Sequence, residues 1–252
     1  MRRAFLIGPL ATCLLPLFGG CAKSPAGGPV VRAVNRFQTT LTVAGTVNPT
    51  YSYGVAFDDA GGDGQGPEAI LGYTPVINRV VGGTFRLLIL YVNGNFRIFY
   101  RSTPADASTE REITGTSGLF VVTPRATQNG LNFTLDLDAF VPGTSTFIFP
   151  HTSGTNPALI SDRFDINAIT TNTAIIDERD VRIKPVDALG PQQIATPVEV
   201  QIGATRTLTI SDATGDENLA DNDFTNPSSP TYVPFSNIDI TSLQIGITRS
   251  SA

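Results

Sequence analysis

Apolar and polar residues alternate in short runs along most of the chain, and a period of two is typical of β-strands. The clearest run is LNFTLDL at 131–137, in which four apolar side chains alternate with three polar ones. Residues 84–101 predict a hairpin, because Asn93-Gly94 is a favoured pair for a two-residue turn. Further strands are predicted at 37–43, 51–57, 119–123, 145–149, 163–169, 180–186, 197–202, 206–211 and 237–248.

No window has a convincing helical period, and the best candidate, 172–180, is long enough for little more than one turn. Short strands separated by Gly, Pro, Asn and Asp are typical of β-sandwiches and β-barrels. We therefore expect an all-β fold, an antiparallel β-sandwich of about ten to thirteen strands with little or no helix, in preference to a closed barrel. Residues 36–252 are long enough to form this sandwich as a single domain.

Residues 1–20 predict a lipoprotein signal peptide. Two arginines precede an apolar run at 4–18, which is shorter than the ~20 residues that span a bilayer and contains two prolines. Gly19 and Gly20 directly before Cys21 resemble the bacterial lipobox, which is cut before a cysteine that receives a diacylglycerol. Phe18 departs from that pattern, where Leu is usual. The alternative is an ordinary cleaved signal peptide.

Cleavage before Cys21 would leave it as the only cysteine of the mature chain, because Cys13 lies in the signal. An intramolecular disulfide and metal sites built on several cysteines are then excluded. Acyl chains such as palmitate on Cys21 would anchor the protein firmly to a membrane. Residues 21–35 begin with the cysteine that would be lipidated, and their Pro and Gly residues predict a flexible tether. Ala22, rather than Asp, favours the outer over the inner membrane in a two-membrane envelope.

The chain is acidic, with a formal net charge of −5. Loss of residues 1–20 removes two arginines and leaves 15 basic against 22 acidic residues, a net charge of −7. This charge repels phosphate backbones, so we expect no nucleic-acid partner. The expected partners are a membrane, through the lipid anchor, and an envelope protein or glycan.

Catalytic chemistry has little support in the sequence. The single histidine, His151, lies in the turn-like segment PHTSGT, and no GxSxG nucleophile motif is present. We expect a loop histidine and a protein without catalytic residues. An envelope hydrolase is the alternative, and it would need His151 or a pair of carboxylates in a deep cleft.

Two acidic loops, at 58–68 and 211–224, are candidates for calcium binding. Carboxylates supply hard oxygen ligands, and glycines let backbone carbonyls turn towards an ion that takes six to eight oxygens. The first loop is glycine-rich, although its spacing is not that of an EF-hand. The alternative is that both loops are solvated connections between strands. The candidate ligands are Asp58, Asp59, Asp63, Glu68, Asp212, Asp216 and Glu217.

The second loop, SDATGDEN, and the later TYVPFSNIDITSLQI resemble the C-terminal domain of glucodextranase, family 9 carbohydrate-binding modules and DOMON-type sandwiches. Those domains carry an Asp-x-x-Gly-Asp-Asp/Glu loop, a Tyr-x-Pro element and Phe-Asp-Ile-Thr at a strand start, which 212–217, 232–234 and 238–241 match. YSYGVAFDDAGGDGQGP also resembles an element of such modules. The resemblance implies a β-sandwich and a structural calcium.

A carbohydrate-binding module is the alternative function that this resemblance raises. Such modules stack sugar rings on exposed aromatic side chains, often those of tryptophan. This chain has no tryptophan. Its six tyrosines would have to form the platform instead. The acidic loop also lies near the C-terminus here, whereas in that family it lies early in the domain.

Overall fold

The computed structural model describes residues 34–59, 65–114, 118–151, 162–172, 178–179, 184–189, 196–199, 205–212, 228 and 234–249. These residues form fourteen strands and two three-residue 3-10 helices, so the all-β prediction is confirmed. Within these ranges no helix is long and apolar enough to cross a membrane. The predicted signal peptide and most of the predicted tether lie outside the described residues. Asn35, the last residue assigned to the tether, is the first residue of a strand.

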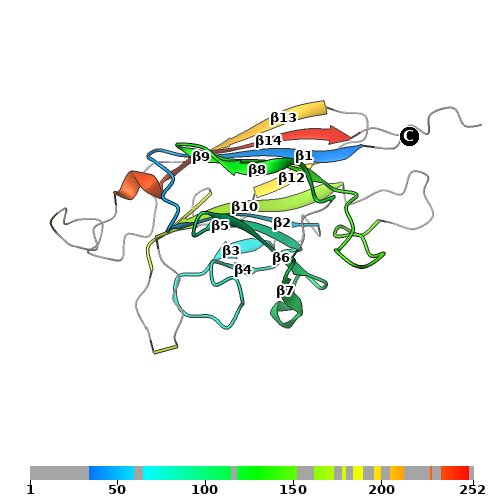
Figure 1. The fold of residues 1–252 in the computed structure, drawn as a ribbon, viewed down its shortest axis with the longest axis horizontal. Coiled ribbons are helices and arrows are strands. Elements are labelled where there is room, and N and C mark those ends of the chain that lie inside the picture. Colours follow the sequence, from blue (N-terminus) through cyan, green and yellow to red (C-terminus); the bar gives the residue numbers. More distant parts are fainter. Residues whose placement is uncertain are drawn as a thin grey trace, which may run out of the picture. The chain divides into compact units, whose positions relative to one another are not determined.

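Five antiparallel strands form the first sheet, sheet A, in the order β13-β14-β1-β9-β8 (Figure 1). The central strand β1 pairs with the C-terminal β14 over its whole length, so the two ends of the domain are hydrogen-bonded together. The strands are β1 (Asn35–Val43), β8 (Phe120–Ala126), β9 (Gly130–Asp136), β13 (Thr205–Ser211) and β14 (Ile240–Arg249).

The second sheet, sheet B, has seven strands in the order β11-β10-β2-β5-β6-β7, and β12 also pairs with β10. The predicted hairpin is confirmed: β5 and β6 pair around Asn93 and Gly94, whose φ angles are 52° and 75°. The strands are β2 (Ser52–Asp58), β5 (Leu87–Val92), β6 (Asn95–Arg101), β7 (Glu110–Glu112), β10 (Arg163–Thr171), β11 (Val186–Ala188) and β12 (Thr196–Glu199).

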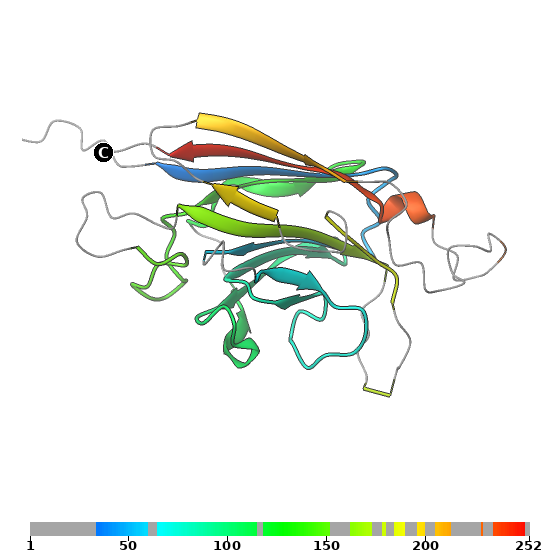
Figure 2. The ribbon, with the colours of Figure 1, turned by 180° about the vertical axis from the view of Figure 1, so that it is seen from behind.

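A third, smaller layer covers the face of sheet B that points away from sheet A (Figures 1 and 2). It consists of the two-stranded sheet of β3 (Pro67–Ala69) and β4 (Val81–Gly83), with the loops around it. The 3-10 helices are η1 (Ala107–Thr109), directly before β7, and η4 (Phe235–Asn237), which leads towards β14. The predicted strand at 145–149 contributes only the single bridge between Phe140 and Phe147.

The main core lies between sheets A and B and is built from the alternation seen in the sequence. On β1, Phe37, Thr39, Leu41 and Val43 are buried, while the residues between them face solvent at least in part. The Phe37 ring packs on Phe164 of sheet B with a centroid distance of 5.0 Å. This contact between the sheets makes the structure a sandwich.

Sheet B, unlike sheet A, is buried on both faces along β2, β5 and β10, because the third layer covers its outer side there. All seven residues of β2 are buried. Its outward residue Ala56 belongs to a second core, together with residues of β5, β6, β10, β11, the third layer and Phe85. The members of this core are Ala56, Val80, Val81, Phe85, Leu88, Leu90, Phe99, Ile169, Val186 and Ala188. Charged residues at the ends of these strands are therefore also placed inside the protein.

Candidate functional site

Five ionisable side chains form one row across the outer face of sheet B. In the strand registers, Asp165 lies opposite Asp58, and Arg101 lies opposite Glu110. Backbone hydrogen bonds connect Arg86, which lies between these pairs, to strands β2 and β6. Each is at most 8% exposed. We call this set the ionic row: Asp165 (β10), Asp58 (β2), Arg86, Arg101 (β6) and Glu110 (β7).

The row lies where several strands begin or end. Asp58 and Arg101 are the last residues of β2 and β6, Glu110 is the first of β7, and Arg86 directly precedes β5. Side chains two residues apart on a strand lie on the same face. Ala56, two residues before Asp58, and Phe99, two residues before Arg101, belong to the second core, so the row faces that core as well. The row thus closes one end of that core.

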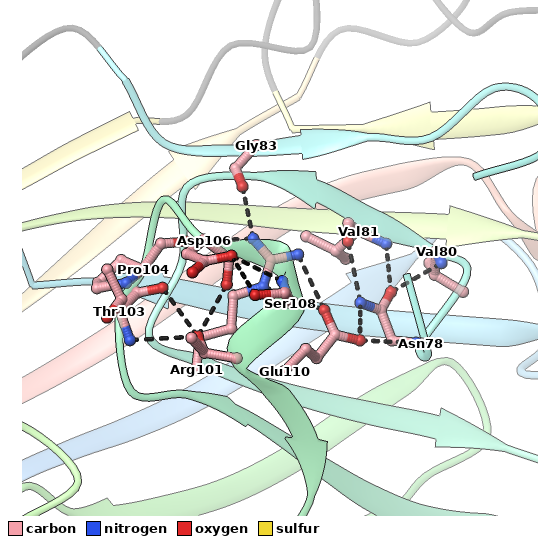
Figure 3. Close-up of polar contacts among 11 residues, drawn as sticks. Asn78, Val80, Val81, Gly83, Arg101, Thr103, Pro104, Asp106, Ser108 and Glu110 are labelled. Carbon is pink, nitrogen blue, oxygen red and sulfur yellow. Dashed lines mark hydrogen bonds and ion pairs between the residues drawn. The ribbon is translucent and has the colours of Figure 1, made fainter. Parts of the chain in front are cut away.

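The Arg101–Glu110 ion pair forms the end of the row at strands β6 and β7 (Figure 3). Arg101 Nη2 and Nε donate to the same carboxylate oxygen, Oε2, over 2.9 and 3.1 Å. Its Nη1 donates to the carbonyl oxygens of Gly83 (2.7 Å) and Pro104 (3.2 Å). The guanidinium carbon also lies 3.8 Å from the Phe85 ring centroid, a cation–π contact. A buried charge with this many partners holds its surroundings in one arrangement.

The second Glu110 oxygen fixes a turn in the third layer. Glu110 Oε1 accepts hydrogen bonds from the Asn78 backbone N–H (2.8 Å) and from Asn78 Nδ2 (2.9 Å). Asn78 Oδ1 in turn accepts from the backbone N–H groups of Val80 (2.8 Å) and Val81 (2.7 Å). Arg79, inside this turn, has a φ of 58°, in the left-handed region that costs energy for residues other than Gly. The hydrogen bonds of Asn78 stabilise that conformation.

Lys184 is a buried cation bound to the same turn. Its Nζ donates to the Arg79 carbonyl oxygen over 2.5 Å, and the residue is 1% exposed. Burial disfavours the charged ammonium and lowers the pKa of Lys184 to about 8. The sequence has only one other lysine, Lys23.

Asp59, a predicted calcium ligand, forms an ion pair. Its Oδ1 accepts from Arg86 Nε over 3.0 Å, and both side chains are 10% exposed. Arg86 Nη1 donates to the carbonyl oxygens of Arg101 and Ser102. This carboxylate therefore connects the start of the first acidic loop to the ionic row.

Asp58, another predicted ligand, lies opposite Asp165 in the β2–β10 register, and they are 0% and 5% exposed. Opposed residues of antiparallel strands have Cβ atoms ~4.5–5.5 Å apart, so two carboxylates meet inside the protein. Glu68 is exposed on β3. Asp63 lies outside the described residues. In the ranges that the structure describes, no group of three or more His, Cys, Asp or Glu residues is placed to hold a metal ion.

The second acidic loop is described only at its first carboxylate. Asp212 directly follows β13, and its backbone N–H donates to the Thr241 carbonyl oxygen over 3.1 Å. Asp216, Glu217 and the lipidation candidate Cys21 lie outside the described residues. Asp239, in the segment that carries the family resemblance, is 2% exposed, and its N–H donates to the Phe235 carbonyl oxygen over 3.2 Å.

His151 stacks on Phe147, with ring centroids 3.8 Å apart and planes inclined by 9°. Its Nε2 lies 3.2 Å from Asp138 Oδ1 in a direction that makes no hydrogen bond. Asp138 instead accepts from Asn35 Nδ2 over 3.0 Å at each oxygen. Burial lowers the pKa of His151, and the Asp138 carboxylate opposes this only in part. The imidazole is therefore neutral at pH 7.

Two surface hollows lie near charged residues. One, of about 410 Å³, is lined by Gln65, Gly66, Glu68, Gly83, Thr84 and Ala105. The other, of about 260 Å³, is lined by Arg163, Val198, Glu199, Arg206 and Leu208. Neither is lined by His151 or by the Asp58–Asp165 pair.

The tyrosines that were candidates for a sugar-binding platform lie mainly in the core. Tyr51, Tyr53, Tyr91 and Tyr100 are at most 9% exposed, and Tyr73 is 41% exposed. Tyr232 lies outside the described residues. Four of the six tyrosine rings are therefore buried away from any ligand on the surface.

Comparisons with known proteins give no relative: no family model, no curated protein and no solved structure matches the chain. Arguments about function therefore rest on the residues of this chain.

The sequence analysis missed Asp165, Glu110, Asn78 and Lys184. Asp165 alternates with Phe164 and Ile166, which predicts an exposed side chain when only one face of the sheet is covered. No sequence signal shows that a third layer covers the second face. For Lys184, the scarcity of lysine was the only available hint.

We predict that Arg101→Met lowers the free energy of unfolding by ~3–5 kcal/mol, because Glu110 would remain buried without its ion-pair partner. Arg97→Met is the matched control, since Arg97 pairs with Glu112 across the same two strands but is 41% exposed. An exposed pair contributes ~0–1 kcal/mol. Urea unfolding of the purified proteins measures both losses. An equal loss of unfolding free energy in Arg101→Met and Arg97→Met would show that burial does not increase the contribution of the ion pair to stability.

A second prediction concerns pH. Below pH 8 folded and unfolded chains both carry the Lys184 proton, and the folded state bears the full cost of burying the charge. Between pH 8 and ~10.4 only the unfolded chain keeps it, so the stability contributed by Lys184 rises with pH. Lys184→Met should exceed wild type in stability at pH 7, and this advantage should shrink by about 3 kcal/mol by pH 10.5. A stability difference that stays constant over this range would contradict the prediction.

Proposed function

We propose that the chain is a lipid-anchored protein of the bacterial cell envelope, with a non-catalytic β-sandwich that has a binding or structural role. The order of the N-terminal residues supports the anchor: two arginines, an apolar run, Gly19-Gly20 and then Cys21. Strand β1 begins at Asn35, fourteen residues after Cys21. A lipid on Cys21 would therefore hold the sandwich close to the membrane surface.

The observation that carries the non-catalytic role is the bonding of the ionic row. Arg101, Glu110 and Asn78 use their polar atoms on one another and on backbone groups, and they join sheet B to the third layer. Charges held in this way stabilise one arrangement of the layers rather than meet a substrate. The neutral, stacked His151 supports the same proposal.

Calcium bracing of the first acidic loop is part of the proposal. Asp58 and Asp165 bring two buried carboxylates side by side at the point where the loop leaves β2. Carboxylate oxygens are the ligands that calcium prefers, and two neighbouring carboxylates would supply part of its coordination shell. In this arrangement the ion would fix the loop to strands β2 and β10.

Radiolabelled palmitate tests the anchor. The full chain expressed in a bacterium should incorporate the label and fractionate with membranes, whereas Cys21→Ser should lose both properties. Cys13→Ser is the matched control and should be labelled like wild type, because its position is removed with the signal. Label that persists in Cys21→Ser, or a wild-type chain without label, would refute the lipid anchor.

Thermal unfolding with 1 mM-scale calcium, and then with excess chelator, tests the bracing. A ligand held a hundredfold above its dissociation constant adds ~2.7 kcal/mol, which should raise the Tm by several degrees. The shift should disappear in Asp165→Asn and persist in Asp136→Asn, a matched change on sheet A. A wild-type Tm that is the same with calcium and chelator would exclude a calcium site of this affinity.

A further inference from the structure

On four of its five strands, the outward side of sheet A carries almost only uncharged polar side chains. Apart from the buried Gly130, which lies opposite Thr42, there are fifteen such positions on β13, β14, β1 and β9: twelve carry a hydroxyl or an amide, one is Gly and two are charged. We call this surface the hydroxyl face. Its residues are Thr205, Thr207, Thr209 and Ser211; Ser242, Gln244, Gly246 and Thr248; Arg36, Gln38, Thr40 and Thr42; and Asn132, Thr134 and Asp136.

Strand registers align these side chains in rows that cross four strands. One row is Thr207, Gly246, Gln38 and Thr134, and the next is Thr209, Gln244, Thr40 and Asn132. Cross-strand hydrogen bonds order the second row: Thr40 Oγ1 donates to Asn132 Oδ1 over 2.7 Å, and Gln244 Nε2 donates to Thr209 Oγ1 over 3.4 Å. The spacing of the polar groups is thus set by the sheet itself.

The hydroxyl face is open to solvent over the described part of the chain. All fifteen residues are exposed or half-buried, in contrast to the outer face of sheet B under its third layer. In both ribbon views no described element lies beyond sheet A (Figures 1 and 2). The face is therefore accessible to a large partner.

The chemistry of the face differs from that of the rest of this acidic chain. Solubility alone is usually served by charged side chains of both signs. The two charged residues within it, Arg36 and Asp136, lie opposite each other in the register, at one end of the face. On the neighbouring strand β8, the exposed Arg125 lies opposite Asn132. Hydroxyl and amide groups donate and accept hydrogen bonds, so they match a partner whose groups also do both and which carries no charge.

We propose that the hydroxyl face binds a neutral polysaccharide, lying across the strands of sheet A. Polysaccharide hydroxyls donate and accept, and the match avoids burying an unpaired charge. Threonine methyl groups offer contacts for the C–H faces of sugar rings, as does Val122, which is 62% exposed next to Thr134. This inference rests on the proposed binding role and names its partner.

Co-sedimentation with insoluble cellulose, chitin and starch tests the proposal, with acidic pectin gel as the anionic arm. The detergent-solubilised full protein should be retained by at least one neutral polymer. The double variant Gln38→Lys/Thr207→Lys should bind it about tenfold more weakly or worse, because two charges would have to lose water. Thr114→Lys/Thr144→Lys, exposed positions outside sheet A, is the matched control and should bind like wild type. Equal melting temperatures verify that each variant is folded.

Three results would overturn the proposal: no retention by any of the neutral polymers, retention by pectin alone, or equal retention of wild type and the Gln38/Thr207 variant. Sedimentation velocity tests whether a second copy of the chain, rather than a polysaccharide, binds to the hydroxyl face. A wild-type dimer that this variant dissociates, without polysaccharide retention, would make the face a contact between two copies of the chain. Palmitate labelling is independent of all these results, so failure here leaves the lipid anchor to its own test.

Discussion

The Arg101–Glu110 ion pair is the interaction on which the inner organisation of this protein depends. Sheet B is the middle of three layers, so strand ends that would otherwise reach water lie under β3 and β4. A buried charge without a partner is strongly destabilising, and the Arg86–Asp59 and Arg101–Glu110 ion pairs meet that requirement for the two arginines of the ionic row. Through Asn78 the same carboxylate fixes the turn that closes the third layer.

Much of sheet A could be predicted from the sequence, because one of its faces is solvated. Strands β1 and β9 alternate apolar and polar residues, and the inward set alone makes the contact with sheet B. The β5–β6 hairpin was equally predictable, since Asn93-Gly94 supplies the positive φ angles that its turn requires. Sheet B was harder: in a sheet covered on both sides, polar residues within the alternation do not mark a solvent face.

The candidate site shows the same limit more sharply. Arg97 and Arg101 share a strand face, and the spacing makes them equivalent. The structure covers only one of them, so Arg97 forms an exposed pair with Glu112 and Arg101 a buried one with Glu110. Likewise Asp59 belongs to a loop that is suited to calcium, yet it pairs with Arg86, a residue that lies far from it in sequence. Local composition identifies which groups are available, whereas long-range packing decides which partner each one meets.

The two sheets thus have different roles in the domain. Sheet B and its ionic row bind the layers together, whereas sheet A buries one face in the core and presents the other to solvent. Phe37 and Leu41 anchor β1 in the core, so the outward side chains of Gln38 and Thr40 are held at the two-residue spacing of the strand. A surface whose polar groups are already ordered loses little conformational entropy on binding. Weak, uncharged hydrogen bonds can then add up to specific recognition only if the partner repeats as regularly as the sheet, as a polymer of identical sugar units does.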